Sequence, residues 1–190
     1  AEIERHLDLL GEYAIQGHFM TDSPEDFQRF AAPLMKNNQA YYAFRIGRED
    51  SREIALFKDG DSWSTRFTDP QNLPGVEQWA YWDRNNLLLK KETLPSAYDC
   101  RNQPGFMSTL QQQGANAAYW TAPYSFMTNM EAGITASVRF TANNGERYVL
   151  SLDTSVNNIS SMTRYITVGK SGFIVLFDAA GAIVGEPARR

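Results

Sequence analysis

The sequence contains few of the residues on which most enzyme and metal sites depend. Its 190 residues include one cysteine, Cys100, and two histidines, His6 and His18. A single cysteine excludes an intrachain disulfide and a thiolate metal site. Because both histidines lie on the first predicted helix or at its end, a histidine-dependent triad or metal cluster would have to be built there. We therefore predict no catalytic residue, no metal and no cofactor.

Two further absences concern partners and membranes. The net charge is −4, the pI is near 5.2, and no basic stripe is present, which argues against a nucleic-acid partner. No apolar run approaches the roughly 18 residues of a membrane-spanning helix. The chain starts directly in a helical pattern rather than in a signal peptide, so we expect a segment excised from a longer protein.

Two binding motifs are present only in part. Gly169-Lys170-Ser171 resembles the end of a phosphate-binding loop, but the position five places earlier, which requires glycine, is Arg164. Asp59-Gly60-Asp61 resembles the start of a calcium loop, but the closing glutamate is replaced by Pro70. We interpret residues 59–61 as a plain turn.

Helical periodicity dominates positions 1–38. One apolar stripe occupies a single face of the first helix: Ile3, Leu7, Leu10 and Ala14. The stripe fits either a helix that pairs with its copy in a dimer or a helix that packs on its own domain. Ser23 and Pro24 then form an N-cap and first-turn proline, which predicts the start of a second helix.

From residue 40 the periodicity becomes that of strands. Strands are predicted over 41–46, 53–57 and 62–67, with mixed strand over 76–93. Residues 69–75 and 95–105 are predicted as loops, and 106–113 as a short helix.

The strongest local signal is a hairpin. Two alternating runs, Ile134–Phe140 and Arg147–Leu152, flank Asn143-Asn144-Gly145, which predicts a type I′ turn. The second strand is expected to end at Asp153, and Thr154 or Ser155 to begin a short helix carrying Ile159 and Met162. A further hairpin is predicted from 171–177 and 182–184.

This order of elements predicts an α+β fold: a long N-terminal helix followed by a PAS-like antiparallel sheet with helices and long loops. One face of the sheet would be covered, and long loops would enclose a ligand site on the other face. We divide the chain into a helical segment (1–38), a ligand-sensing module (39–168) and a hairpin (169–190) that starts a second module or completes the first.

Three segments in fixed order carry a resemblance to a known family. They are Tyr98–Phe106, Trp120–Tyr124 and the strand Tyr148–Asp153. Together they resemble the extracytoplasmic Cache sensor domains of bacterial transmembrane receptors, in particular the membrane-distal module of double Cache domains. The resemblance covers about residues 1–185.

The resemblance also implies a pocket. In amino-acid-binding members the family's tyrosine, arginine, tryptophan, tyrosine and aspartate correspond here to Tyr98, Gln103, Gly105, Tyr124 and Asp153. Gln103 cannot form the charged bidentate clamp that arginine offers a carboxylate, so Arg101 or Arg139 is a candidate replacement. The predicted ligand-binding residues are Tyr98, Arg101, Gln103, Trp120, Tyr124 and Asp153. Two alternatives stay open: Asp153 as a helix cap and Trp120 as a core residue.

The function implied by the resemblance is ligand sensing without catalysis. The expected ligand is a small molecule of the amino-acid, amine or organic-acid class, and the expected assembly is a homodimer through the first helix. The domain would lie on the periplasmic or extracellular side of the inner membrane, attached through spans outside the chain. A ligandless dimerisation module is the alternative, and an enzyme is a distant third.

Overall fold

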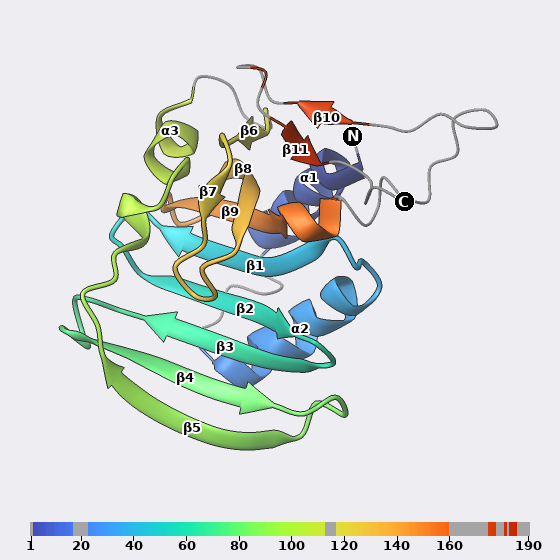
Figure 1. The fold of residues 1–190 in the computed structure, drawn as a ribbon. Helices are drawn as coiled ribbons and strands as arrows, with labels where there is room; N and C mark the ends of the chain where they lie inside the picture. The colour runs from blue at the N-terminus through green and yellow to red at the C-terminus, as the bar shows by residue number, and fades with distance from the viewer. Residues whose placement is uncertain are drawn as a thin grey trace.

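An antiparallel sheet with two longer helices on one face and a short helix on the other organises the chain (Figure 1). The computed structural model describes residues 2–16, 23–112, 117–159, 175–177, 181 and 183–185. The helices are α1 (Glu2–Ile15), α2 (Pro24–Lys36), the 3₁₀ turn η1 (Cys100–Asn102) and α3 (Phe106–Gln111). The strands are β1 (Tyr41–Arg48), β2 (Glu53–Asp59), β3 (Ser62–Thr68), β4 (Val76–Trp82), β5 (Leu88–Pro95), β6 (Tyr119–Trp120), β7 (Tyr124–Ser125), β8 (Ala132–Thr141), β9 (Arg147–Ser155), β10 (Leu176–Phe177) and β11 (Ile183–Gly185).

The main sheet has nine strands in the described part of the chain. Its order is β5-β4-β3-β2-β1-β9-β8-β6, and β7 also pairs with β8. The strands β1 to β5 follow one another as hairpins, after which the β8–β9 hairpin returns to pair β9 with β1. The predicted α+β class with an antiparallel sheet is therefore confirmed.

Helices α1 and α2 cover one face of this sheet. The apolar stripe of α1 is buried within its own chain, with Leu7, Leu10 and Ala14 all in the core. Helix α2 begins as predicted, since the Ser23 hydroxyl accepts a hydrogen bond from the Asp26 amide and Pro24 is the first helical residue. Its Phe27 stacks on Phe44 of β1 with ring centroids 5.5 Å apart. The stripe thus serves packing on the chain's own sheet.

The turn between β8 and β9 differs from the predicted type. A β-turn places Asn143 and Asn144 at its centre, closed by a hydrogen bond from the Gly145 amide to the Ala142 carbonyl. Of these turn residues only Gly145 has a positive φ, 86°. A type I′ turn requires positive φ at both central residues, so that prediction was wrong. The glycine instead follows the turn, an arrangement common in slightly longer hairpin loops.

Strand β9 also extends further than predicted. It continues to Ser155, residues 156–159 are helical, and the Ser155 hydroxyl accepts a hydrogen bond from the Asn158 amide. Ser155 is therefore the cap, and Asp153 lies inside the strand. Met162 and most of the predicted last hairpin lie outside the described residues; its described parts, β10 and β11, pair with each other.

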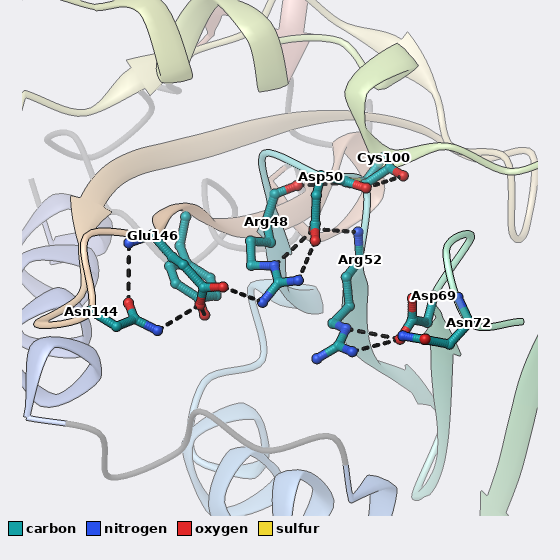
Figure 2. A network of polar contacts seen from close by, with 10 residues as sticks. Arg48, Asp50, Arg52, Asp69, Asn72, Cys100, Asn144 and Glu146 are labelled. Carbon is teal, nitrogen blue, oxygen red and sulfur yellow. Dashed lines mark hydrogen bonds and ion pairs between the residues drawn. The ribbon is translucent and has the colours of Figure 1, made fainter.

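A network of ion pairs and hydrogen bonds between side chains connects the loops at one end of the sheet (Figure 2). Arg48, the last residue of β1, bonds Asp50 in the following turn and Glu146 just before β9, with 2.6 Å between Arg48 Nη1 and Glu146 Oε1. Arg52 binds Asp69, which follows β3, through Nε and Nη2. The network ties the β1–β2 turn to both neighbouring connections.

This network predicts a loss of stability in acid. Hydrogen bonds from Arg48 hold the pKa of Asp50 below its ordinary value despite partial burial. Burial would raise the pKa of Asp69, but hydrogen bonds from Asn72 and Arg52 outweigh it and lower the pKa. Because these folded-state pKa values lie below the unfolded ones, the stabilisation is complete above about pH 4 and is lost as the pH falls through the folded values.

The measurement is urea unfolding at several pH values between 7 and 2.5. We expect Asp69→Asn to be less stable than the parent protein at pH 7 and to lose less stability on acidification. The same change at Asp8, exposed on α1, is the control and should leave the parent pH dependence intact. Equal acid sensitivity of Asp69→Asn and the parent protein would contradict this account.

Candidate functional site

The sheet face opposite α1 and α2 carries two buried ion pairs. Strand alternation places Arg45 between the core residues Phe44 and Ile46, so that its side chain lies on the other face. Arg45 Nη2 is 2.8 Å from Asp153 Oδ1, and both side chains are at most 7% exposed. Next to this pair, Arg66 Nη2 is 2.8 Å from Glu53 Oε1, and these side chains are at most 6% exposed. Four charges are thus withdrawn from water, and they sum to zero.

Two tyrosines extend these pairs. The Tyr98 hydroxyl donates to both oxygens of Glu53, at 2.9 and 3.1 Å. The Arg66 guanidinium lies over the Tyr98 ring, 3.6 Å from its centroid. This is a cation–π contact, in which the charge is attracted to the negative face of the ring.

On the other side, Thr135 Oγ1 donates to Asp153 Oδ1 at 2.6 Å. The Tyr124 and Thr135 hydroxyls are 2.7 Å apart. Since the Thr135 proton is already committed to Asp153, Tyr124 is the donor in that bond. Tyr98 therefore donates directly to Glu53, and Tyr124 is linked to Asp153 through the Thr135 hydroxyl.

Burial and the neighbouring charges set the protonation of this cluster. Burial and then the negative charge of Glu53 raise the pKa of Tyr98 well above its ordinary value, so its hydroxyl remains a neutral donor. Burial disfavours the charged form of Arg45, but the electrostatic attraction of several neighbours together, Asp153 first among them, outweighs burial and raises the pKa of Arg45. Burial raises the pKa of Asp153, and the Arg45 charge and the Thr135 hydrogen bond oppose that rise. The charge of Arg45 and the charge of Asp153 therefore each depend on the presence of the other.

A short loop between β7 and β8, residues 126–131, lies over the cluster; we call it the closing loop (Figure 1). Its anchor is Phe126, which is buried, stacks on Tyr42 at 5.4 Å and meets Tyr124 edge-on at 5.2 Å. The Phe126 ring fits over Gly133, where a Cβ atom would come within 2.1 Å of it.

The tip of the closing loop is held by polar contacts. Thr128 hydrogen-bonds the Tyr42 hydroxyl at 2.8 Å. Gln103 Nε2 donates to Met127 Sδ at 3.2 Å. The loop is therefore attached both to β1 and to the loop before α3.

Beneath the closing loop is a small pocket of about 10 Å³. That is roughly the space of one water molecule. Its lining consists of Arg45, Phe57, Arg66, Tyr98, Gln103, Tyr124, Phe126, Met127, Thr128 and Asp153. The structure thus brings together four of the six residues predicted from sequence: Tyr98, Gln103, Tyr124 and Asp153. Any ligand larger than water requires the loop to move.

The remaining two predicted residues lie elsewhere. Arg101 forms a bidentate pair with Asp99, two positions before it, and its side chain is 46% exposed. Trp120 packs against the core on the α1 side, and its Nε1 donates to Glu4 at 3.1 Å. Trp120 is thus a partly buried residue packed against the core, as in the alternative left open from sequence.

Gly105 departs from the family pattern for a conformational reason. Its φ is 83°, and a Cβ there would lie 2.8 Å from the Thr121 side chain. A tryptophan, which the resemblance places at this position, rarely adopts such a backbone.

Sequence reasoning missed Arg45, Glu53 and Arg66. Their signal was present: each charge alternates with apolar or core residues in a strand, in Phe44-Arg45-Ile46, Glu53-Ile54 and Thr65-Arg66-Phe67. A charged side chain in such a strand is either exposed to solvent or buried in an ion pair. Only the pairing register of the strands decides which of the two applies. No comparable sequence pattern marked Phe126 or Met127 as site residues.

The fold is shared with solved sensory domains of bacterial chemoreceptors. The ligand-binding domain of the amino-acid chemoreceptor PctB of Pseudomonas aeruginosa PAO1, in complex with L-Arg, matches 99% of this chain with a TM-score of 0.61 and 18% identity. That of Tlp3 of Campylobacter jejuni, in complex with 4-methylisoleucine, matches 97% with a TM-score of 0.60 and 13% identity. That of CtaA of Pseudomonas fluorescens, in complex with L-serine, matches 98% with a TM-score of 0.57 and 15% identity.

These matches cover 61–66% of the chemoreceptor domains, so the chain spans less than two thirds of their length. No protein-family model matches the sequence, and no curated protein matches it significantly. Among the residues that the structure describes, no helix is both long and apolar enough to cross a membrane. The three-dimensional likeness shows that this chain has the α+β fold of chemoreceptor ligand-binding domains, as its resemblance to Cache domains predicted.

Proposed function

We propose that this chain is the ligand-sensing domain of a bacterial transmembrane receptor and lies outside the cytoplasm. The observation that carries the proposal is the pocket: two buried ion pairs and two tyrosines beneath a loop, on the sheet face left open by α1 and α2. A buried polar cluster of this kind stabilises a fold poorly compared with apolar packing. A ligand site is the function that best accounts for it.

The donors of the pocket favour a small carboxylate as the ligand. Asp153 is already paired with Arg45, so the ammonium group of an amino acid or amine would have to compete with a guanidinium. Arg45 Nε and Arg66 Nε are buried and have no hydrogen-bond partner among the residues that the structure describes. These N–H groups, together with Gln103, suit the oxygens of an anion. Of the three ligand classes expected from sequence, we therefore propose the organic acids.

Signalling would follow from a shift between closed and open arrangements of the closing loop. The pocket residue Asp153 belongs to β9, and Thr135, which donates to it, belongs to β8. Both strands pack against α1 on the opposite face. A change in the position of these strands would therefore directly alter their packing against α1. Leu9 of α1 is 51% exposed on the outer side of the helix, and we propose this side for a homodimer.

Thermal unfolding with organic acids, amino acids and amines tests the proposal. A ligand at 100 times its dissociation constant adds about 2.7 kcal/mol, which raises the melting temperature by several degrees. We expect one or more small carboxylates to do so.

A matched pair of variants locates the effect. Met127, at the pocket, is 66% exposed, and Met107, on α3 outside the pocket lining, is 39% exposed, so both can be changed to alanine without opening the core. Met127→Ala should change the ligand-induced shift, whereas Met107→Ala should preserve it. Absence of any shift across the panel, with a stable dimer by sedimentation, would instead support the ligandless dimerisation module.

A further inference from the structure

A second, larger hollow lies beside the pocket on the same face of the sheet. It is an open groove of about 910 Å³, within the size range of small-molecule sites. Phe57 and Thr128 line both hollows, so the groove begins where the pocket ends. Most of its floor comes from β2, β3 and β4, and Thr128, Asn129 and Glu131 of the closing loop also line it.

Aromatic rings form the floor of the groove. Tyr42, Phe57, Trp79 and Tyr81 follow one another in a row, with neighbouring centroids 6.0, 5.6 and 6.1 Å apart. The faces of such rings attract cations. Two cations of the chain already use them: the Arg66 guanidinium is 5.8 Å from the Trp79 ring, and the Lys90 ammonium is 5.4 Å from the Tyr81 ring.

The charged residues that line the groove are mostly acidic. There are four carboxylates against one lysine: Asp59, Asp61, Glu77, Glu131 and Lys58. Lys90, beside the groove, is paired with Glu92, and Arg66, next to Trp79, with Glu53. The groove therefore presents a negative field over an apolar floor.

The carboxylates stand at both ends of the Trp79–Tyr81 pair. Glu77 is held at one end, accepting hydrogen bonds from Trp79 Nε1 at 2.8 Å and from the Ser96 hydroxyl at 3.0 Å. Asp59 and Asp61 lie beyond the other end, since Tyr81 pairs with Ser64 and Ser62 pairs with Asp59. Glu77 and Tyr81 are four positions apart on the same strand, a separation of about 13 Å at the usual rise of a strand.

We propose that this groove is a second ligand site, for an elongated organic cation with a positive charge at each end. Its apolar chain would lie on Trp79 and Tyr81, and its charged ends would meet Glu77 on one side and Asp59 and Asp61 on the other. The site uses none of the four residues of the buried ion pairs. It is therefore distinct from the ion-pair pocket, with which it shares Phe57 and Thr128.

Isothermal titration calorimetry at low salt with two linear probes of equal length tests the site. The diamine 1,10-diaminodecane carries both charges, and 1,10-decanediol carries none. We expect the diamine to bind at least tenfold more tightly than the diol. Failure of the diamine to bind, or equal binding of both probes, would overturn the proposal.

Charge-neutralising variants distinguish the groove from a general attraction to an acidic protein. The double variant Asp59→Asn/Asp61→Asn should weaken diamine binding about tenfold. The double variant Asp8→Asn/Glu12→Gln changes the net charge equally on exposed positions of α1 and should leave the dissociation constant within about twofold. All four residues are exposed, so both variants should fold. Equal weakening by the two would show non-specific attraction and refute the site.

Discussion

Replacement of Asp153 with alanine is expected to lower the free energy of unfolding by about 3–5 kcal/mol. The variant leaves the Arg45 guanidinium charged on the sheet face, where its side chain is only 7% exposed, without the carboxylate that neutralises it. Thr135 loses the acceptor of its hydroxyl in the same step. Urea unfolding at pH 7 measures the effect.

A double variant separates the cost of an orphaned charge from the value of the pair. Arg45→Met with Asp153→Leu removes both charges, and we expect it to be far less destabilising than Asp153→Ala alone, because buried pairs replaced by apolar residues lose little. A loss below about 1 kcal/mol for Asp153→Ala would contradict a buried, obligatory pair. The expected loss also makes Asp153→Ala a poor probe of ligand binding, since weakened folding would imitate weakened binding.

Replacement of Arg66 with alanine is expected to cost a similar amount, about 3–5 kcal/mol. Glu53, with a side chain only 3% exposed, would keep just the Tyr98 hydroxyl as a donor. The Tyr98 ring would lose the guanidinium that lies 3.6 Å from its centroid. Arg66→Lys keeps the charge but loses the planar fork, so we expect an intermediate loss.

Arg29→Ala supplies the matched control for this second variant. Arg29 pairs with Asp26 at 3.2 Å, but the two side chains are 78% and 57% exposed. A surface pair of this spacing on a helix contributes no more than about 0.5 kcal/mol. Similar losses for Arg29→Ala and Arg66→Ala would show that burial does not govern the stability of these pairs.

Much of the fold could be predicted because periodicity reports which side chains are buried. The stripe at Leu7, Leu10 and Ala14 and the cap at Ser23 mark α1 and α2 by local spacing alone. The alternation in 134–140 and 147–152 likewise marks the central hairpin. Its turn type was missed because only one of the expected left-handed positions, Gly145, takes a positive φ.

Site residues were predictable only within the segments that carry the family resemblance. Tyr98, Tyr124 and Asp153 came from its segments, but the partner of Asp153 is 108 residues away in sequence and is set by the pairing of β1 with β9. Arg101 was assigned to the pocket although Asp99, two positions before it, offered a local partner. Trp120 belongs to the Trp120–Tyr124 segment of the resemblance, but its side chain packs against the core on the other face of the sheet.

The central claim, that a ligand is enclosed beneath the closing loop, is tested most directly by amide hydrogen exchange. The Phe126 amide donates to the Glu131 carbonyl at 2.8 Å and the Met130 amide to the Phe126 carbonyl at 2.9 Å. Both bonds lie within the closing loop, so exchange at these amides reports its local unfolding. The account predicts that the carboxylate giving the largest thermal shift slows exchange at these two amides. Stabilisation of the protein with unchanged exchange at Phe126 and Met130 would place the ligand elsewhere and contradict it.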